Sequence, residues 1–155
     1  MGNQPSSGFP TDPAGLPEAV RPPTVGLGDG ESFAIRIAPV AKRIGDETVR
    51  MLAYNGSIPG PTLRVTQGSE VSIEVTNEGD LADTVHWHGL RLENRYDGTL
   101  HTQSAIPQGG SFTYRLAFPD PGVYWYHPHV REDYGQEMGL YGNCLLYTSD
   151  AADEL

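Results

Sequence analysis

The chain has few of the residues expected in a disulfide-bonded or nucleic-acid-binding protein. Its 155 residues include a single cysteine, Cys144, which cannot form an internal disulfide. Ten basic residues stand against twenty acidic ones, giving a formal net charge of -10. No basic surface is therefore expected to follow a phosphate backbone or an anionic membrane. We predict no nucleic-acid partner and no membrane partner.

Long apolar runs are also missing. No stretch of 18 or more apolar residues occurs, which argues against a transmembrane helix. The first thirty residues lack the charged start and apolar stretch of a secretory leader. The localisation stays open, because an exported protein that had lost its leader would look the same as a cytoplasmic one.

Turn-forming residues and short apolar segments dominate the rest of the sequence. Nineteen glycines and thirteen prolines separate segments rich in Val, Ile, Thr and Tyr. The length suits one domain. Strict alternation of apolar and polar residues predicts half-buried strands, as in Val71-Ser72-Ile73-Glu74-Val75. Further strands are expected near residues 32–37, 48–54, 63–65, 84–89, 111–118 and 123–127, with a weak helical turn near 132–138.

This pattern predicts an all-β fold, a Greek-key β-sandwich of about seven strands. Residues 1–30 are crowded with Pro, Gly, Ser and Asp and show no periodicity. We therefore expect them to form a flexible N-terminal arm. The folded domain is expected to begin at residue 31.

Four of the five histidines form two His-x-His pairs, His86/His88 and His127/His129. On a strand, residues two apart project from the same face, so each pair presents two imidazoles to one side. A lone pair of this kind is more often structural. Two pairs in one small β domain favour a metal site, and neutral imidazole suits copper, zinc, iron and nickel.

Several motifs together resemble the first domain of multicopper oxidases, the laccase-like family. They are YNGSIPGPTLRV at 54–65, HWHG at 86–89, PQGGSFTYRL at 107–116 and GVYWYHPH at 122–129. The resemblance covers residues 32–143 and implies a cupredoxin-like Greek-key sandwich over residues 31–143. It also implies a copper-dependent oxidoreductase as the full-length parent, which oxidises a reducing substrate and reduces dioxygen to water.

The resemblance further implies a copper role for each paired histidine. His86 matches a ligand of the type 2 copper, and His88 and His127 match ligands of one type 3 copper. His129 matches a ligand of the other type 3 copper. The other half of the ligands would come from a C-terminal cupredoxin domain missing here, so the fragment alone is expected to be inactive.

Other residues near these motifs allow a functional and a structural interpretation. Asp97 matches a family position near the cluster and is a candidate proton relay, or else a turn residue before Gly98. The acidic residues Glu132, Asp133 and Glu137 could support a ligand imidazole but more often form a solvated face. Four aromatic residues beside the histidines are expected to shield the site from solvent, with an electron-relay role as the alternative: Trp87, Tyr124, Trp125 and Tyr126. His101 is expected to be exposed and not a ligand.

The last twelve residues, 144–155, resemble a translated sequencing adapter. We expect them to be a non-native tail that follows a reading frame cut after about Asn143, with an ordinary acidic tail as the alternative. Cys144 does not lie in a His-Cys-His context, so it does not match a type 1 copper ligand.

Three other functions fit the same fold. A non-catalytic copper-binding or copper-delivery module would bind the metal tightly with four histidines alone. A structural relative that has lost its metals is the second alternative, and the presence of all four expected histidines argues against it. A copper nitrite reductase shares the fold but has a different histidine pattern.

Overall fold

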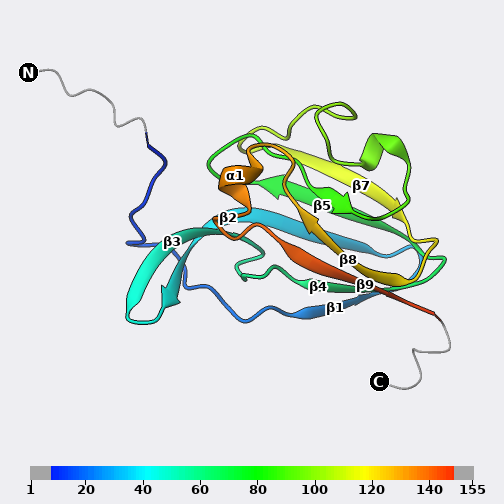
Figure 1. The fold of residues 1–155 in the computed structure, drawn as a ribbon, viewed down its shortest axis with the longest axis horizontal. Helices are drawn as coiled ribbons and strands as arrows, with labels where there is room; N and C mark the ends of the chain where they lie inside the picture. Colours follow the sequence, from blue (N-terminus) through cyan, green and yellow to red (C-terminus); the bar gives the residue numbers. More distant parts are fainter. Residues whose placement is uncertain (1–7, 149–155) are drawn as a thin grey trace, which may run out of the picture.

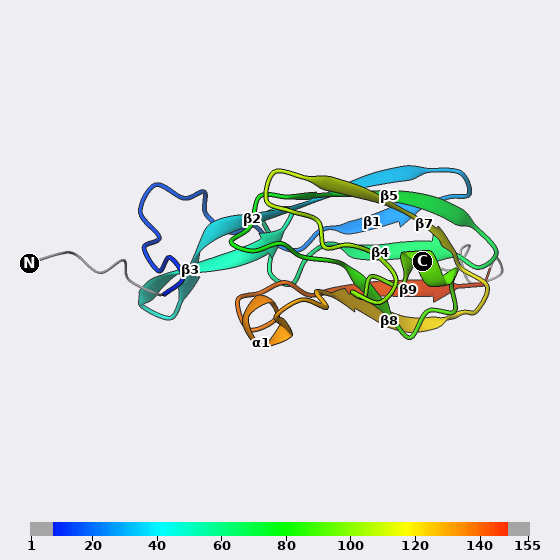
Figure 2. The ribbon, with the colours of Figure 1, turned by 90° about the horizontal axis from the view of Figure 1, so that it is seen from above.

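Two β-sheets packed face to face make up the protein in a computed structural model that describes residues 8–148. One sheet has five strands in the order β1-β4-β9-β8-β6, and the other has four in the order β3-β2-β5-β7. Figure 1 shows the strands running nearly along the long axis, and Figure 2 shows the two layers from the side. The prediction of an all-β, cupredoxin-like sandwich is confirmed.

The elements are mostly short strands joined by turns. The strands are β1 (Thr24–Leu27), β2 (Ser32–Ile44), β3 (Glu47–Tyr54), β4 (Thr62–Thr66), β5 (Glu70–Asn77), β6 (His86–His88), β7 (Ser111–Ala117), β8 (Gly122–His127) and β9 (Gly142–Tyr147). A 3₁₀ turn, η1 (Asn94–Tyr96), and one short helix, α1 (Glu132–Gly135), complete the described fold. The helix lies within the expected range but is shorter. None of the helices in residues 8–148 is long and apolar enough to cross a membrane.

The core lies between the sheets and follows the alternation in the sequence. In β5, Val71, Ile73 and Val75 are at most 1% exposed, while the residues between them face away from the core. Large aromatic side chains fill the centre, and Trp87, Tyr114 and Tyr126 are all fully buried. Burying each such ring contributes on the order of 2 kcal/mol.

The predicted flexible arm is partly structured. Strand β1 pairs in parallel with β4, Thr24 opposite Thr62, and the amide of Ala19 donates to the carbonyl of Ala41. The prediction of a flexible arm over 1–30 is therefore wrong for this part of it, and residues 1–7 lie outside the described residues. The segment follows the edge of the sandwich through backbone hydrogen bonds, which do not require an apolar periodicity in its side chains.

The predicted domain boundary at residue 143 falls inside a strand. Strand β9 lies between β4, to which it is parallel, and β8, to which it is antiparallel. Cys144 and Leu146 point into the core and are 0% and 5% exposed. Residues 144–147 are thus part of the described domain, and residues 149–155 lie outside the described range. The adapter hypothesis concerns the gene and stays a prediction.

Candidate metal centre

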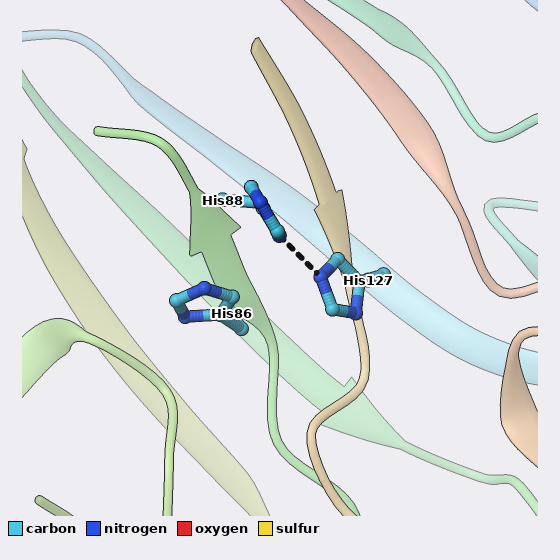
Figure 3. A group of neighbouring side chains, drawn as sticks. All are labelled: His86, His88 and His127. Atoms are coloured by element: carbon cyan, nitrogen blue, oxygen red, sulfur yellow. Dashed lines mark hydrogen bonds between the residues drawn. The ribbon is translucent and has the colours of Figure 1, made fainter. Parts of the chain in front are cut away.

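The two His-x-His pairs are brought together by one antiparallel ladder. Strand β6 pairs with β8, with His86 opposite His127 and His88 opposite Trp125. Figure 3 shows His86 and His88 on β6 facing His127 on β8. The pairing joins segments about forty residues apart in sequence and creates a single cluster of imidazoles.

Trp87 fixes the direction of both histidines on β6. Its side chain is fully buried, with ring centroids 5.4 Å from Tyr126 and 5.7 Å from Tyr114. Because successive strand residues point to opposite faces, burying Trp87 turns His86 and His88 away from the core together.

All four predicted ligands lie close together. One ring nitrogen each of His86, His88 and His127 lies within 4.8 Å of the others. The ring of His129 lies 5.2 Å from that of His86 and 6.2 Å from that of His127, measured between centroids. No other such group of three or more potential metal ligands occurs among residues 8–148. His101 is exposed on a turn and outside this cluster.

Two of the imidazoles have Nδ1 hydrogen-bonded to a backbone carbonyl oxygen, and a third has Nδ1 close to a carboxylate oxygen. The Nδ1 of His86 lies 2.5 Å from the carbonyl oxygen of Asp97, and that of His127 lies 2.7 Å from the carbonyl oxygen of Pro128. Nδ1 of His129 lies 3.2 Å from Oε1 of Glu132. A carbonyl oxygen can only accept, so Nδ1 of His86 and His127 must carry the proton. Their Nε2 lone pairs are then left for a metal.

His88 differs from the other three. Its Nδ1 faces Nε2 of His127 at 3.2 Å, the contact drawn in Figure 3. Two nitrogens bound to one metal at about 2.0 Å each lie about 3 Å apart, so this gap suits a shared ion.

Burial is graded across the cluster. His127 is 3% exposed, the His86 side chain 17% and the His129 side chain 41%. Burial lowers the pKa of His127, with smaller contributions from the nearby imidazoles. His127 is therefore held in the neutral form that a metal requires.

The candidate proton relay, Asp97, lies beside the cluster. Its backbone carbonyl accepts from His86, and its side-chain Oδ1 lies 3.6 Å from the same Nδ1, with 34% of the side chain exposed. The left-handed Gly98 follows, with φ of 76°, and packs directly against the backbone of Val85. Both readings of Asp97 fit this position, and its role as a relay stays a prediction.

The acidic residues after the second pair separate into different roles. Glu132 contacts His129, whereas Asp133 forms a two-point ion pair with Arg131 on the surface and Glu137 is exposed. The carbonyls of Asp97 and Pro128 were not anticipated as partners of the histidines. Every residue has a carbonyl, so the sequence carries no signal for them.

The donor set fits copper. It consists of imidazoles only, and copper heads the affinity order of divalent metals for nitrogen ligands. Two Nδ1 atoms are hydrogen-bonded to carbonyl oxygens, the arrangement that orients metal-binding histidines, and the Nδ1 of His129 lies 3.2 Å from a carboxylate oxygen.

Comparison with known proteins decides the family. The family model described as "Multicopper oxidase" matches residues 38–151. The chain belongs to the multicopper oxidase family. A curated member, multicopper oxidase MmcO of Mycobacterium tuberculosis, is 40% identical over 139 residues, covering 88% of this chain and 25% of that protein. Copper resistance protein A of Pseudomonas syringae pv. tomato is 33% identical over 125 residues, covering 80% of this chain and 20% of that protein.

Solved multicopper oxidases share the fold. The multi-copper oxidase from Pseudomonas thermotolerans superposes with a TM-score of 0.74 at 28% identity, over 80% of this chain and 30% of that one. The blue copper oxidase from Nitrosomonas europaea superposes with a TM-score of 0.72 at 31% identity, over 78% of this chain and 40% of that one. The chain thus spans a fifth to a quarter of the length of the two curated relatives compared.

Proposed function

We propose that this chain supplies half of the histidine ligands of a trinuclear copper cluster. The full-length parent would couple one-electron oxidation of a reducing substrate to four-electron reduction of dioxygen to water. The observation that carries this proposal is the convergence of four imidazoles from β6 and the end of β8. A C-terminal cupredoxin domain of the parent would supply the remaining ligands.

Each histidine has a proposed place in the cluster. His86 would bind the type 2 copper, and His88 and His127 would share one type 3 copper. The 3.2 Å gap between their ring nitrogens supports that sharing. His129, whose ring centroid lies 5.2 Å from that of His86 and whose side chain is more exposed than that of His86, would bind the second type 3 copper.

The protein groups would orient ligands and handle protons. Copper, when bound, would accept the electrons and deliver them to dioxygen. The carbonyls of Asp97 and Pro128 would hold His86 and His127 in the tautomer with Nε2 free. The Asp97 carboxylate, partly exposed and 3.6 Å from His86, would carry protons between solvent and the site.

A chimera would test this function. Residues 38–147 would replace the matching segment of Mycobacterium tuberculosis MmcO, and oxygen consumption and its products would be measured. We expect consumption of four electrons per dioxygen without peroxide. His→Gln at position 86, 88, 127 or 129 should lower the rate at least about 100-fold, and His101→Gln, a matched control, should not. A copper-loaded chimera that consumes no oxygen would contradict the proposal.

Calorimetric titration of the chain alone with cuprous and cupric ions tests the alternative. A partial ligand set should bind weakly, with Kd above about 1 μM. Tighter binding would favour a copper-delivery module.

A further inference from the structure

A buried ion pair joins strand β3 to the loop before β6. Arg50 on β3 donates two hydrogen bonds to the carboxylate of Asp80, at 2.8 and 2.6 Å, and both side chains are less than one-tenth exposed. A buried pair of this kind contributes little net stability, because removing both charges from water offsets their attraction. A role in fixing the positions of the segments that it joins therefore explains the pair better than a contribution to stability does.

A third member extends this pair to the helix that follows His129. The hydroxyl of Tyr134, in α1, donates to Oδ2 of Asp80 at 2.8 Å. Burial alone would raise the pKa of Asp80, but the hydrogen bonds from Arg50 and Tyr134 outweigh it and lower that pKa. Burial and the Asp80 carboxylate raise the pKa of Tyr134 to about 12, so the phenol stays a donor at neutral pH. We call Arg50, Asp80 and Tyr134 the clamp.

The N-terminal segment contacts two members of the clamp, Tyr134 and Arg50. Phe9 stacks on the Tyr134 ring with centroids 3.7 Å apart, and the carbonyl of Pro10 accepts a hydrogen bond from Arg50 at 3.2 Å. The clamp therefore ties together β3, the loop before β6, the N-terminal segment and α1.

Helix α1 contacts His129 and the proline that precedes it. Gly135 packs so closely on Pro128, between His127 and His129, that an added Cβ would come within 2.8 Å of its ring. Glu132, in the first turn of α1, is the partner of Nδ1 of His129 at 3.2 Å. Figures 1 and 2 show α1 beside the end of β8. Glu132 belongs to α1, so the position of its carboxylate beside His129 depends on how α1 is held.

We infer that Asp80 and Tyr134 are positioning residues for His129. They hold α1 in place, so that Glu132 fixes the orientation of the His129 imidazole. The inference rests on the proposed function for the importance of His129 as a ligand. The chain of contacts runs from Asp80 through Tyr134 and Glu132 to His129. His86 is held by the backbone carbonyl of Asp97, which is not part of this chain of contacts, whereas the carbonyl that holds His127 belongs to Pro128, on which α1 packs.

The test uses the metal-free, full 155-residue chain labelled with ¹⁵N. Long-range proton–nitrogen correlation at about pH 8 reports which ring nitrogen of each neutral histidine carries the proton. In the wild type, we expect His129 mainly as the Nδ1–H tautomer. Tyr134→Phe removes one hydroxyl and should shift His129 toward the Nε2–H form, leaving His86, whose partner is the carbonyl of Asp97, unchanged. Phe9→Ala should shift it in the same direction.

Tyr141→Phe is the matched control, because the same atom is removed from a more exposed ring that follows α1 in the sequence. It should leave His129 unchanged. An unchanged His129 in Tyr134→Phe would overturn the inference, as would an equal shift in all four histidines or the same shift in Tyr141→Phe. The proposed copper function is tested separately, by measuring the oxygen consumption of the chimera. A failure of that function can therefore be distinguished from a failure of this inference.

Discussion

The indole of Trp125 stacks against the imidazoles of both His127 and His88, with centroids 4.0 and 5.1 Å apart and planes within 30°. The contact to His127 follows from their spacing of two on β8, and the contact to His88 from the pairing of β6 with β8. One side chain thus packs against the two histidines proposed to share a copper.

Replacing Trp125 should weaken copper binding. Trp125→Ala removes the stacking surface that restricts both imidazoles, and we expect at least about a tenfold loss of copper affinity by titration of the chimera. Trp125→Phe keeps an aromatic face and should lose much less. Equal affinities for Trp125→Ala and wild type would show that the stack does not support the ligands.

Gly98 is expected to tolerate no side chain. A Cβ there would lie 1.9 Å from the carbonyl oxygen of Val85, and the residue has a φ of 76°. Gly109 has nearly the same φ, 78°, but open space around it. Gly109→Ala should therefore lower the free energy of unfolding by about 1 kcal/mol, from backbone strain alone. Gly98→Ala should lower the free energy of unfolding, measured with urea, by at least about 2 kcal/mol more than Gly109→Ala does. Similar losses in the two variants would refute the close packing of Gly98 on Val85.

Asp83 should make the stability fall as pH rises. Burial raises the pKa of this carboxyl to about 7, although the amide of Thr84 donates to it. The folded state therefore binds a proton more tightly than the unfolded state, whose carboxyl titrates near 3.9. Stability is greatest below about pH 4 as far as this group is concerned, and is lost as pH rises toward 7, by up to roughly 4 kcal/mol.

Urea unfolding of Asp83→Asn and wild type between pH 4 and pH 8 would check this. The variant should lack the decline, and the difference between the two curves should grow with pH. His127 acts in the opposite direction, because its lowered pKa makes stability fall as pH drops. It is present in both proteins and cancels in the comparison. Asp46→Asn, at a fully exposed position, is the control and should follow the wild type. Parallel curves for Asp83→Asn and wild type would contradict the prediction.

Strand β9 offers a matched pair of substitutions. Leu146 is 5% exposed and faces the core, whereas its neighbour Leu145 faces the other way and is only partly buried. Leu146→Ala should lower the free energy of unfolding by about 2–5 kcal/mol. The same change at Leu145 should cost clearly less. If thermal or urea unfolding gave the reverse order, the orientation of β9 would be wrong.

The sequence predicted the strands with a clear alternation of apolar and polar side chains, and missed β1 and β9. β5 was predicted from Val71, Ile73 and Val75, because burial of one face imposes a period of two. β1 is a four-residue edge strand that contributes few core side chains, and β9 follows the histidine region in a segment interpreted as foreign. Parallel pairing with β4 depends on distant residues, which no local pattern reveals.

The site shows the same division. The two His-x-His pairs could be identified from spacing, since each pair shares a strand face. That His86 lies opposite His127 depends on the register between β6 and β8. The reach of α1 from Tyr134 to Asp80 depends on the fold of the whole domain.

Trp87 occupies the position between two proposed ligands and at the same time lies at the centre of the core. Loosening of the sandwich around this indole would rotate β6 and separate its two imidazoles. Copper occupancy would then act as a gauge of folding, and a destabilised variant would lose its metal before its strands come apart.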